Sequence, residues 1–287
     1  MSEFDDWIGR SITASDTLDP ARCNALDIAL GGAGGLQIGD PMPLLDHWLH
    51  FWDMKPPSEL GTDGHPAKGG FLPPVRLPRR MWAGGRLSFA KPLMLGQEVR
   101  KTSTIASIAE KEGRSGKLVF VTIRHDFEAG EGVAVSEEQD LVYREPATRR
   151  LAMSEPEDAP GAAWCATINP DPVLLFRYSA LTMNGHRIHY DRPYAIEEEY
   201  YPGLVVHGPL QAKLMIRLAV AHLGDTITEF DFRGQQPAFD GLPLHICGNP
   251  GDRDAELWTQ QGEAKNMVAS VRTDRYRYRM FTRFGSR

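Results

Sequence analysis

Cysteine is scarce in this chain. The 287 residues include three cysteines, Cys23, Cys165 and Cys247, which lie far apart in the sequence. Their odd number and wide spacing argue against a disulfide framework and against a zinc-binding cysteine cluster. We therefore expect reduced thiols and a cytoplasmic location, because reducing compartments keep thiols unpaired.

The sequence also lacks the usual features of membrane and nucleic-acid-binding proteins. No apolar run approaches the roughly 20 residues that span a bilayer, and the opening residues MSEFDD are acidic, unlike a signal peptide. The formal net charge is −6, so no basic field favours nucleic acid. Neither GxGxxG nor GxxxxGK occurs, which excludes the common glycine-rich phosphate loops.

The first half of the chain predicts two helices followed by four strands. Asp19–Pro20 is typical of a helix start, with Asp as N-cap and Pro at the first helical position, and Gly31 ends that helix. A strongly apolar segment over residues 44–52 predicts a second helix. After Met81 the apolar period changes to two, which predicts strands at about 81–90, 98–111, 117–128 and 132–143.

The second half repeats this order of elements. Asp171–Pro172 predicts a helix start, residues 203–223 predict a long apolar helix, and strands are expected at about 226–235, 243–249, 254–261 and 265–273. We interpret the repeat as a duplication within an α+β fold. Its parts are an N-terminal half over 1–148, a linker over 149–163 and a C-terminal half over 164–287.

The loop between the two helices of the second half carries clustered polar residues. Asn184, His186, His189 and Asp191 lie close together, and His207–Gly208 opens the long helix. A lone histidine is more often structural than catalytic, but the polar residues near His189 in the sequence favour a catalytic role. A neutral imidazole can take a proton from water near neutral pH. The Asn184 amide cannot accept a proton, but it can hold the water in place.

Gly208 has two interpretations. It can be a simple helix-capping glycine, or it can let a thioester approach the backbone closely because it has no Cβ. In the second case, unpaired N–H groups and the helix dipole would stabilise an enolate oxygen. A zinc site from His186, His189 and His207 lacks a fourth ligand at a recognisable spacing, so we expect no metal.

The segments FRYSALTMNGHRIHYDRPYA and YPGLVVHGPLQAKLM resemble the MaoC-like, hydroxyacyl-thioester dehydratase type 2 family of hot-dog proteins. The resemblance implies a double hot-dog fold, in which each antiparallel sheet wraps a central helix. It places His189 on the catalytic histidine and Gly208 on the glycine that binds the thioester carbonyl. Asn184 stands where the wider family has a catalytic aspartate, and His186–Arg187 replaces Asn-Pro. The first half would only shape the acyl pocket.

The same resemblance implies an acyl-CoA hydratase or dehydratase that adds water reversibly to an α,β-unsaturated acyl-CoA. Within the family, the motif is most similar to hydratases of C5 dicarboxylic substrates, mesaconyl-C4-CoA or itaconyl-CoA. A carboxylate in the acyl group needs a buried cation. The candidates are Arg187, Arg177 and the arginines between Arg76 and Arg86, with His186 as a further contact.

Other functions stay open from the sequence. They are 3-hydroxyacyl-thioester dehydration in fatty-acid synthesis, acyl-CoA thioester hydrolysis, and acyl-CoA binding without catalysis. No cofactor is expected, because coenzyme A is part of the substrate and the thioester already acidifies the α-carbon. We expect an acyl-CoA as the partner molecule, no nucleic acid, no membrane, and a homodimer as the candidate assembly.

Overall fold

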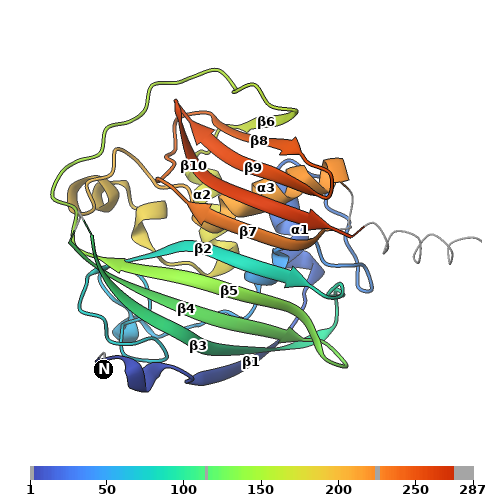
Figure 1. The fold of residues 1–287 in the computed structure, drawn as a ribbon, viewed down its shortest axis with the longest axis horizontal. Helices are drawn as coiled ribbons and strands as arrows, with labels where there is room; N and C mark the ends of the chain where they lie inside the picture. Colours follow the sequence, from blue (N-terminus) through green and yellow to red (C-terminus); the bar gives the residue numbers. More distant parts are fainter. Residues whose placement is uncertain (1–2, 114–115, 224–226, 275–287) are drawn as a thin grey trace, which may run out of the picture.

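The computed structural model describes residues 3–113, 116–223 and 227–274, and its strands form a single antiparallel sheet. The sheet has the strand order β1-β3-β4-β5-β2-β7-β10-β9-β8-β6 (Figure 1). The strands are β1 (Ser11–Thr17), β2 (Arg79–Phe89), β3 (Glu98–Gly113), β4 (Gly116–Glu128), β5 (Val133–Arg144), β6 (Trp164–Ile168), β7 (Ile227–Gly234), β8 (Leu244–Pro250), β9 (Asp254–Gln261) and β10 (Ala264–Thr273).

The strand order repeats between the two halves of the chain. From the outer edge to the centre, the N-terminal half runs β1-β3-β4-β5-β2, and the C-terminal half runs β6-β8-β9-β10-β7. Each half therefore places its first strand at an edge and its second strand at the seam, as a duplication requires. All eight predicted strands are present, whereas β1 and β6 were not predicted. Both are short, and neither has fully buried residues to produce a marked period-two pattern.

The seam between the halves depends on a glycine pair. β2 pairs with β7 from Gly84↔Arg233 to Ser88↔Glu229. A Cβ at Gly84 would lie 2.5 Å from the Phe232 carbonyl oxygen, and one at Gly85 would lie 2.8 Å from the Phe232 ring. Residues without a Cβ thus let the two backbones approach closely enough to join the halves in one sheet. The predicted domain boundaries at 148 and 163 stay predictions.

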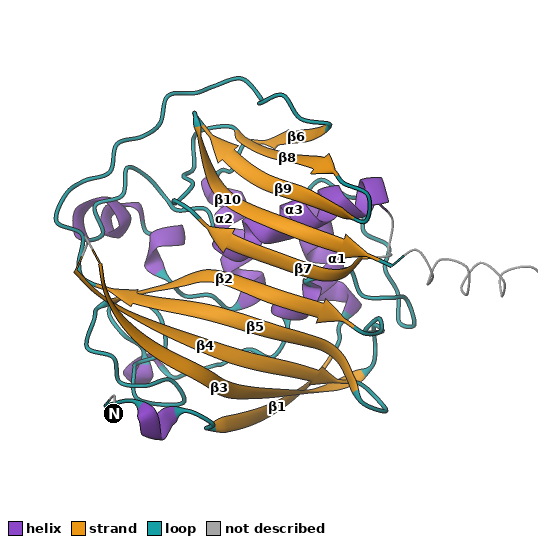
Figure 2. Cartoon of the chain, in the orientation of Figure 1, coloured by secondary structure: helices purple, strands orange, loops and turns teal. Residues whose placement is uncertain are grey.

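The helices lie on one face of the sheet (Figure 2). They are α1 (Pro20–Ala29), α2 (Pro172–Thr182) and α3 (Gly208–Leu223), together with the short turns η1 (Asp5–Trp7), η2 (Asp46–Leu49), η3 (Pro57–Glu59), η4 (Arg187–His189) and η5 (Tyr194–Glu198). Asp19 Oδ1 accepts a hydrogen bond from the Ala21 N–H (2.8 Å), and Asp171 Oδ1 accepts one from the Leu174 N–H (2.7 Å). Both predicted N-caps are therefore confirmed. No described helix is long and apolar enough to cross a membrane.

The central helix is complete in the second half only. The 16-residue α3 is buried along most of its length against the concave face of the sheet. Its counterpart in the first half is the four-residue turn η2, so the helix predicted over 44–52 is wrong. Left-handed backbone at Leu45 (φ 71°) and Phe51 (φ 59°) breaks the segment on both sides of η2. Its apolar residues pack inward from a turn, and space remains beside them under the first-half strands.

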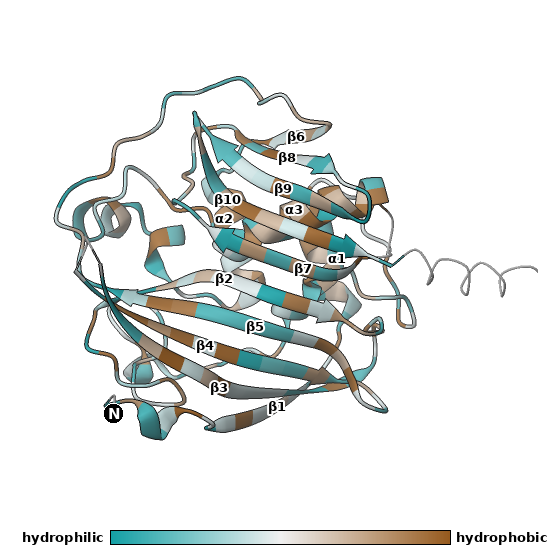
Figure 3. Cartoon of the chain, in the orientation of Figure 1, coloured by the Kyte–Doolittle hydropathy of each residue, from teal (hydrophilic) through white to brown (hydrophobic). Residues whose placement is uncertain are grey.

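Apolar residues line the concave face of the sheet. Hydrophobic and hydrophilic residues alternate along the strands (Figure 3), and β4 buries every second residue from Val119 to Phe127. One large cluster of buried residues surrounds α3, and a second lies under the first-half strands around Ile105, Val121 and Tyr143. This alternation is the physical basis of the strand predictions.

The cysteines differ from the expectation. Cys165 on β6 and Cys247 on β8 face each other directly across the two strands and form a disulfide, whereas Cys23 is free and buried. The prediction of three reduced thiols is therefore wrong for this pair. Strand pairing brings together residues that are 82 positions apart, which spacing in the sequence could not reveal.

Two loops from different halves dock on each other beside α3. The Arg187 N–H donates to the Asp63 carbonyl oxygen (2.9 Å), and Arg187 Nη1 donates to the Thr62 carbonyl oxygen (3.1 Å). Gly64 has a φ of +87°, and a Cβ there would overlap the Gly185 carbonyl oxygen. The loop after η3 therefore supports the loop after α2 through direct backbone contact.

A buried ion pair fixes η2 to α3, and its removal should destabilise the fold. Lys213 Nζ lies 2.5 Å from Asp46 Oδ1, with both side chains at most 6% exposed. Lys213→Met should lower the free energy of unfolding by about 3–5 kcal/mol, because it leaves a buried carboxylate without its cation. The Asp46→Asn/Lys213→Met double variant should regain most of that loss. Urea unfolding measures both.

A matched control for this pair is Arg272→Met at the exposed Arg272–Glu229 pair, where the side chains are 68% and 45% exposed. It should cost less than about 1 kcal/mol. A Lys213→Met loss no larger than this control would contradict a structural role for the buried pair.

The docking of the two loops gives a second prediction. Gly64→Ala should destabilise the protein by roughly 2 kcal/mol or more beyond Gly69→Ala, because backbone atoms must move apart in the first variant. Gly69 also has positive φ (+94°), but the nearest atom to a Cβ there is 3.7 Å away. Both substitutions thus carry the same kind of backbone strain. The difference between the two variants in thermal unfolding therefore measures the clash at Gly64. Equal losses would show that the loops can separate freely.

Candidate active site

The end of α2 positions Asn184. Met183 adopts the left-handed conformation (φ 52°), and the Asn184 N–H donates to the Ser179 carbonyl oxygen (2.8 Å). This C-terminal cap turns the chain away from the helix axis immediately before Asn184. The Asn184 Oδ1 then accepts the His186 N–H (3.0 Å). Among the described residues the Asn184 NH₂ group donates no hydrogen bond to the protein, so it is free to donate to a ligand.

His189 lies at the end of η4 and is buried. Its Nδ1 lies 2.7 Å from the Val205 carbonyl oxygen. A carbonyl can only accept, so Nδ1 carries the proton and Nε2 carries a lone pair. The Val205 N–H also donates to the Ile188 carbonyl oxygen (3.0 Å), which fixes the segment before α3 against η4. The imidazole is therefore held in the tautomer that can act as a base through Nε2.

His207 stacks on His189 directly before α3. The ring centroids are 3.6 Å apart with an interplanar angle of 17°, and His207 Nε2 lies 2.8 Å from Ser179 Oγ. Burial lowers the pKa of His189 to about 3, and the neighbouring His186 adds to this effect. Burial and the charge of His189 also place the pKa of His207 well below its ordinary value. Both rings are thus neutral near pH 7.

Gly208 is the first residue of α3 and is partly exposed. A Cβ there would meet Met267 Cε at 3.5 Å and the Trp82 carbonyl oxygen at 3.8 Å, which are ordinary contact distances. No protein atom therefore forces a glycine at this position. A glycine instead leaves the N-terminus of α3 open to a ligand, where the first N–H groups of the helix lack intrahelical acceptors.

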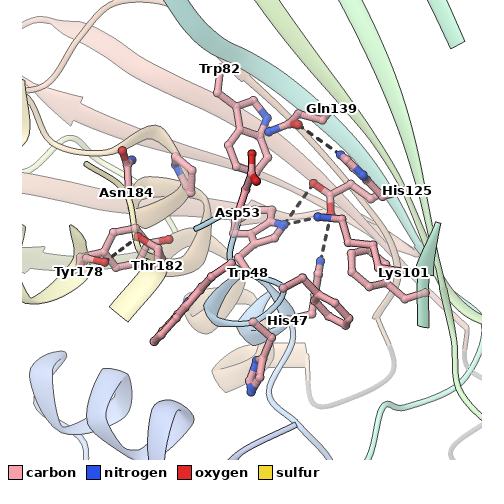
Figure 4. Close-up of a pocket in the computed structure, with 16 residues that line it drawn as sticks. His47, Trp48, Asp53, Trp82, Lys101, His125, Gln139, Tyr178, Thr182 and Asn184 are labelled. Carbon is pink, nitrogen blue, oxygen red and sulfur yellow. Dashed lines mark hydrogen bonds and ion pairs between the residues drawn. The ribbon is translucent and has the colours of Figure 1, made fainter. Parts of the chain in front are cut away.

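A cavity of about 220 Å³ lies where the first half lacks a central helix. Asn184, Thr182 and Tyr178 line one side of it, and Lys101 and His125 lie on the opposite side, with Trp48 between them (Figure 4). Pro209 at the start of α3 also lines the cavity. The whole lining comprises His47, Trp48, His50, Phe51, Trp52, Asp53, Trp82, Lys101, His125, Phe127, Glu137, Gln139, Tyr178, Thr182, Asn184 and Pro209.

The structure brings some of the predicted residues together and keeps others apart. Asn184, His186 and His189 share one short loop, and Gly208 follows His207, which stacks on His189. Arg187 is paired with Asp191 through Nε (2.9 Å) and Nη2 (2.8 Å). It borders a separate surface pocket of about 420 Å³. Arg177 is exposed on α2. Neither arginine lines the cavity that Asn184 borders.

His186 belongs to a group that the sequence did not indicate. Its ring centroid lies 4.2 Å from that of His65, and His65 Nδ1 lies 3.1 Å from Asp63 Oδ2. Each of the three residues offers a ligand atom within 4.8 Å of the others, so among the described residues this group could hold a metal ion. The zinc alternative weighed from the sequence used His189 and His207 instead. The expectation of no metal stays a prediction.

The cavity residues of the first half were also not predicted. Lys101, His125, Glu137 and Gln139 stand on β3, β4 and β5 in phase with inward-facing apolar residues such as Val99 and Val121. A polar residue at a core position of a predicted strand is unusual, and it can indicate a functional residue. The sequence could have identified these positions as unusual, although it could not have shown that they share one cavity with Asn184.

Comparison with known proteins agrees with this architecture. The model of the hydroxyacyl-thioester dehydratase type 2 family matches residues 45–240. The mesaconyl-C(4)-CoA hydratase of Chloroflexus aurantiacus is 48% identical over 250 residues, which cover 86% of this chain and 89% of the relative.

Two solved structures share the fold. The MaoC-like dehydratase of Phytophthora capsici has a TM-score of 0.68 and 14% identity, covering 93% of this chain and 95% of that one. A Mycobacterium tuberculosis protein described as a double hotdog fold has a TM-score of 0.56 and 12% identity, covering 94% and 98%. The predicted double hot-dog fold is confirmed. Because its family model covers most of the sequence, the chain belongs to the hydroxyacyl-thioester dehydratase type 2 family.

Proposed function

We propose that this protein is a hydro-lyase that adds water reversibly to an α,β-unsaturated acyl-CoA with a C5 dicarboxylic acyl group, such as mesaconyl-C4-CoA or itaconyl-CoA. The observation that carries the reaction is the neutral, oriented His189 between the Asn184 loop and the start of α3. The 48% identity to a mesaconyl-C(4)-CoA hydratase supports the substrate class. This arrangement supplies a base, a water-binding amide and an oxyanion site.

The reaction follows from these groups. Water donates one proton to His189 Nε2 while the Asn184 NH₂ group donates a hydrogen bond to the water oxygen. The hydroxyl adds to the β-carbon, and the electron pair of the double bond moves to the thioester oxygen as an enolate. The N–H groups at Gly208 and the first turn of α3 stabilise that oxygen. His189 then returns its proton to the α-carbon, and dehydration is the reverse.

The low pKa of His189 keeps its neutral form populated, at a cost in basicity toward water. A base with pKa about 3 stays deprotonated at neutral pH. Once protonated in its buried site it is a strong acid, so it returns the proton readily to the α-carbon. No cofactor is needed in this scheme, since the thioester stabilises the carbanion, and coenzyme A belongs to the substrate. We propose that catalysis also proceeds without a metal ion.

The alternatives differ in measurable ways. A 3-hydroxyacyl-thioester dehydratase of fatty-acid synthesis would need room for a long apolar chain. The cavity of about 220 Å³ is smaller than the roughly 300–1,000 Å³ of sites for drug-sized ligands, and it carries a lysine and ionised groups. A thioesterase would release free thiol. A non-catalytic module would bind acyl-CoA without turnover.

We propose a homodimer as the assembly and the cytoplasm as the location; the Cys165–Cys247 disulfide departs from the reduced thiols expected there. An apolar surface on the contacting helices α1 and α2 supports the dimer, because Ile28, Val173 and Phe176 are 51%, 62% and 62% exposed. Size-exclusion chromatography with light scattering would distinguish it from a monomer.

The central prediction concerns His189. His189→Gln should lower kcat/KM for mesaconyl-C4-CoA hydration by about 10²–10⁴-fold, because general acid–base catalysis contributes that much. Loss of the conjugated enoyl thioester absorbance measures the rate, and a thiol reagent checks that no free coenzyme A appears. The matched control is His222→Gln, at an exposed histidine stacked on Trp164, which should keep the wild-type rate. A His189→Gln enzyme with most of its kcat/KM would remove His189 as the base.

The pH profile gives an independent prediction. For an ordinary histidine with pKa 6.5, the neutral fraction at pH 5.5 would be about tenfold lower than at pH 7.5. Because the pKa of His189 is about 3, kcat/KM should not fall through its protonation between pH 7.5 and 5.5. Buried histidines with lowered pKa bind more protons when unfolded, so stability declines as pH falls below about 6.5. Circular dichroism at each pH must therefore confirm the folded state. A kinetic pKa near 6.5 in a folded enzyme would contradict the neutral, desolvated His189.

A further inference from the structure

The cavity beside Asn184 has a polar band across its first-half wall. Ser103 on β3, His125 on β4 and Glu137 on β5 are directly opposite one another in the sheet. Lys101 and Gln139 lie two residues away on the same face of their strands. A site for a hydrocarbon chain would place apolar groups here, because burying unpaired polar groups is costly. The band therefore indicates a polar end on the acyl group.

The ionised carboxylate in this band is already saturated. Glu137 accepts the Trp48 Nε1–H at both oxygens (3.1 and 3.0 Å), and His47 Nε2 lies 3.0 Å from Oε2. Burial alone would raise the pKa of Glu137, but the hydrogen bond and charge of His47 outweigh it and hold the pKa below its usual value. Glu137 thus serves to fix η2 against β5, and its oxygens are occupied.

His125 is likewise paired within the protein. Its Nδ1 lies 2.7 Å from Ser103 Oγ, and its Nε2 lies 3.2 Å from Gln139 Oε1. Burial lowers the pKa of His125 to about 4, with the charge of Lys101 as a further cause. The ring is neutral near pH 7, so it contributes no cation to the cavity.

Lys101 supplies the lysine ammonium of the cavity lining, and Asp53, the other carboxylate there, pairs with Lys55 (3.2 Å). Among the described residues no carboxylate forms an ion pair with its ammonium, which instead lies 5.8 Å from the Phe51 ring centroid and 6.0 Å from that of Phe127. Burial lowers the pKa of Lys101, and the charges of Glu137 and Asp53 oppose that shift without direct contact. A desolvated ammonium between two rings gains most from an anion that enters with the substrate.

We propose that Lys101 binds the free carboxylate of the acyl group and thereby sets the preference for dicarboxylic substrates, an inference that rests on the proposed function. Asn184 lines one side of the cavity and Lys101 and His125 the opposite side (Figure 4), so an acyl group that binds at Asn184 and extends into the cavity would face Lys101. None of the arginines named from the sequence lines this cavity. Arg187 is paired with Asp191 and Arg177 is exposed on α2, while the lining also lacks Arg76, Arg79, Arg80 and Arg86. The specificity residue thus belongs to the first half and the base to the second.

The test compares kcat/KM on mesaconyl-C4-CoA and on crotonyl-CoA, which lacks the second carboxylate. In Lys101→Met the ratio of the two values should fall by about 10- to 100-fold, the usual weight of a hydrogen bond to a charged group. Lys101→Gln should give a similar fall and guards against misfolding caused by the apolar side chain. Lys101→Arg, which keeps the charge, should retain part of the preference.

Two further variants make the result specific. Lys111→Met carries the same substitution on β3 at an exposed position outside the cavity, and it should leave the ratio unchanged. Arg80→Met tests a competing cation, since the charge of Arg80 contributes to the lowered pKa values of His65 and His186. A preference that disappears in Arg80→Met but survives in both neutral Lys101 variants would overturn the assignment.

The outcome for the wild-type enzyme separates the two levels of the proposal. Equal kcat/KM values on both substrates would reject the dicarboxylic substrate class itself. A strong wild-type preference that persists in folded Lys101→Met and Lys101→Gln would leave the proposed function intact and reject only the role of Lys101.

Discussion

The concave face of the ten-stranded sheet must be covered along its whole width, and this requirement determines where a ligand can bind. In the second half α3 lies along that face with half of its residues buried. In the first half the corresponding segment contributes only the short turn η2. The remaining space is closed by side chains from strands and loops, which leave a cavity under β3, β4 and β5. A duplication of one unit therefore yields a filled half and a hollow half.

Buried charges hold the hollow half in shape. A four-residue turn has too few internal hydrogen bonds to be stable alone, so η2 depends on partners from distant segments. Lys213 on α3 pairs with Asp46, while Glu137 on β5 holds His47 and Trp48. These contacts attach η2 to the central helix on one side and to the sheet on the other. Glu137, His47 and Trp48 also line the cavity, so stability and the shape of the binding site are coupled.

The sequence predicts what is local and misses what depends on distant segments. The caps Asp19 and Asp171 and the eight alternating strands follow from spacing within a few residues, and the structure contains them. The segment 44–52 was misread because an apolar run can pack inward from a turn as well as from a helix. Cys165 and Cys247 meet only through strand pairing. The edge strands β1 and β6 have no buried residues to mark them.

The candidate site also combines residues that are close in the sequence with residues from distant segments. Asn184, His186, His189 and Gly208 lie within one continuous stretch, so a motif could place them together. Asp63 and His65 reach that stretch only because Gly64 allows their loop to touch Gly185. Lys101 and Glu137 occupy core positions of strands that fold under it. Polar residues in phase with apolar ones were visible in the sequence, but the cavity that they share depends on sheet register.

In the proposed mechanism, the histidine cluster takes the place of a catalytic carboxylate. His189 stacks on His207 and lies 5.5 Å from His186, which in turn contacts His65. Burial lowers the pKa of each of these rings, and the charge of a neighbouring histidine adds to this effect for His186, His189 and His207, so an added proton is held only weakly. A paired aspartate beside His189 would stabilise the imidazolium and slow return of its proton to the α-carbon. In the proposed mechanism, Asn184 positions water without that effect, and the neutral imidazole of His189 serves as base and then as acid in the same turnover.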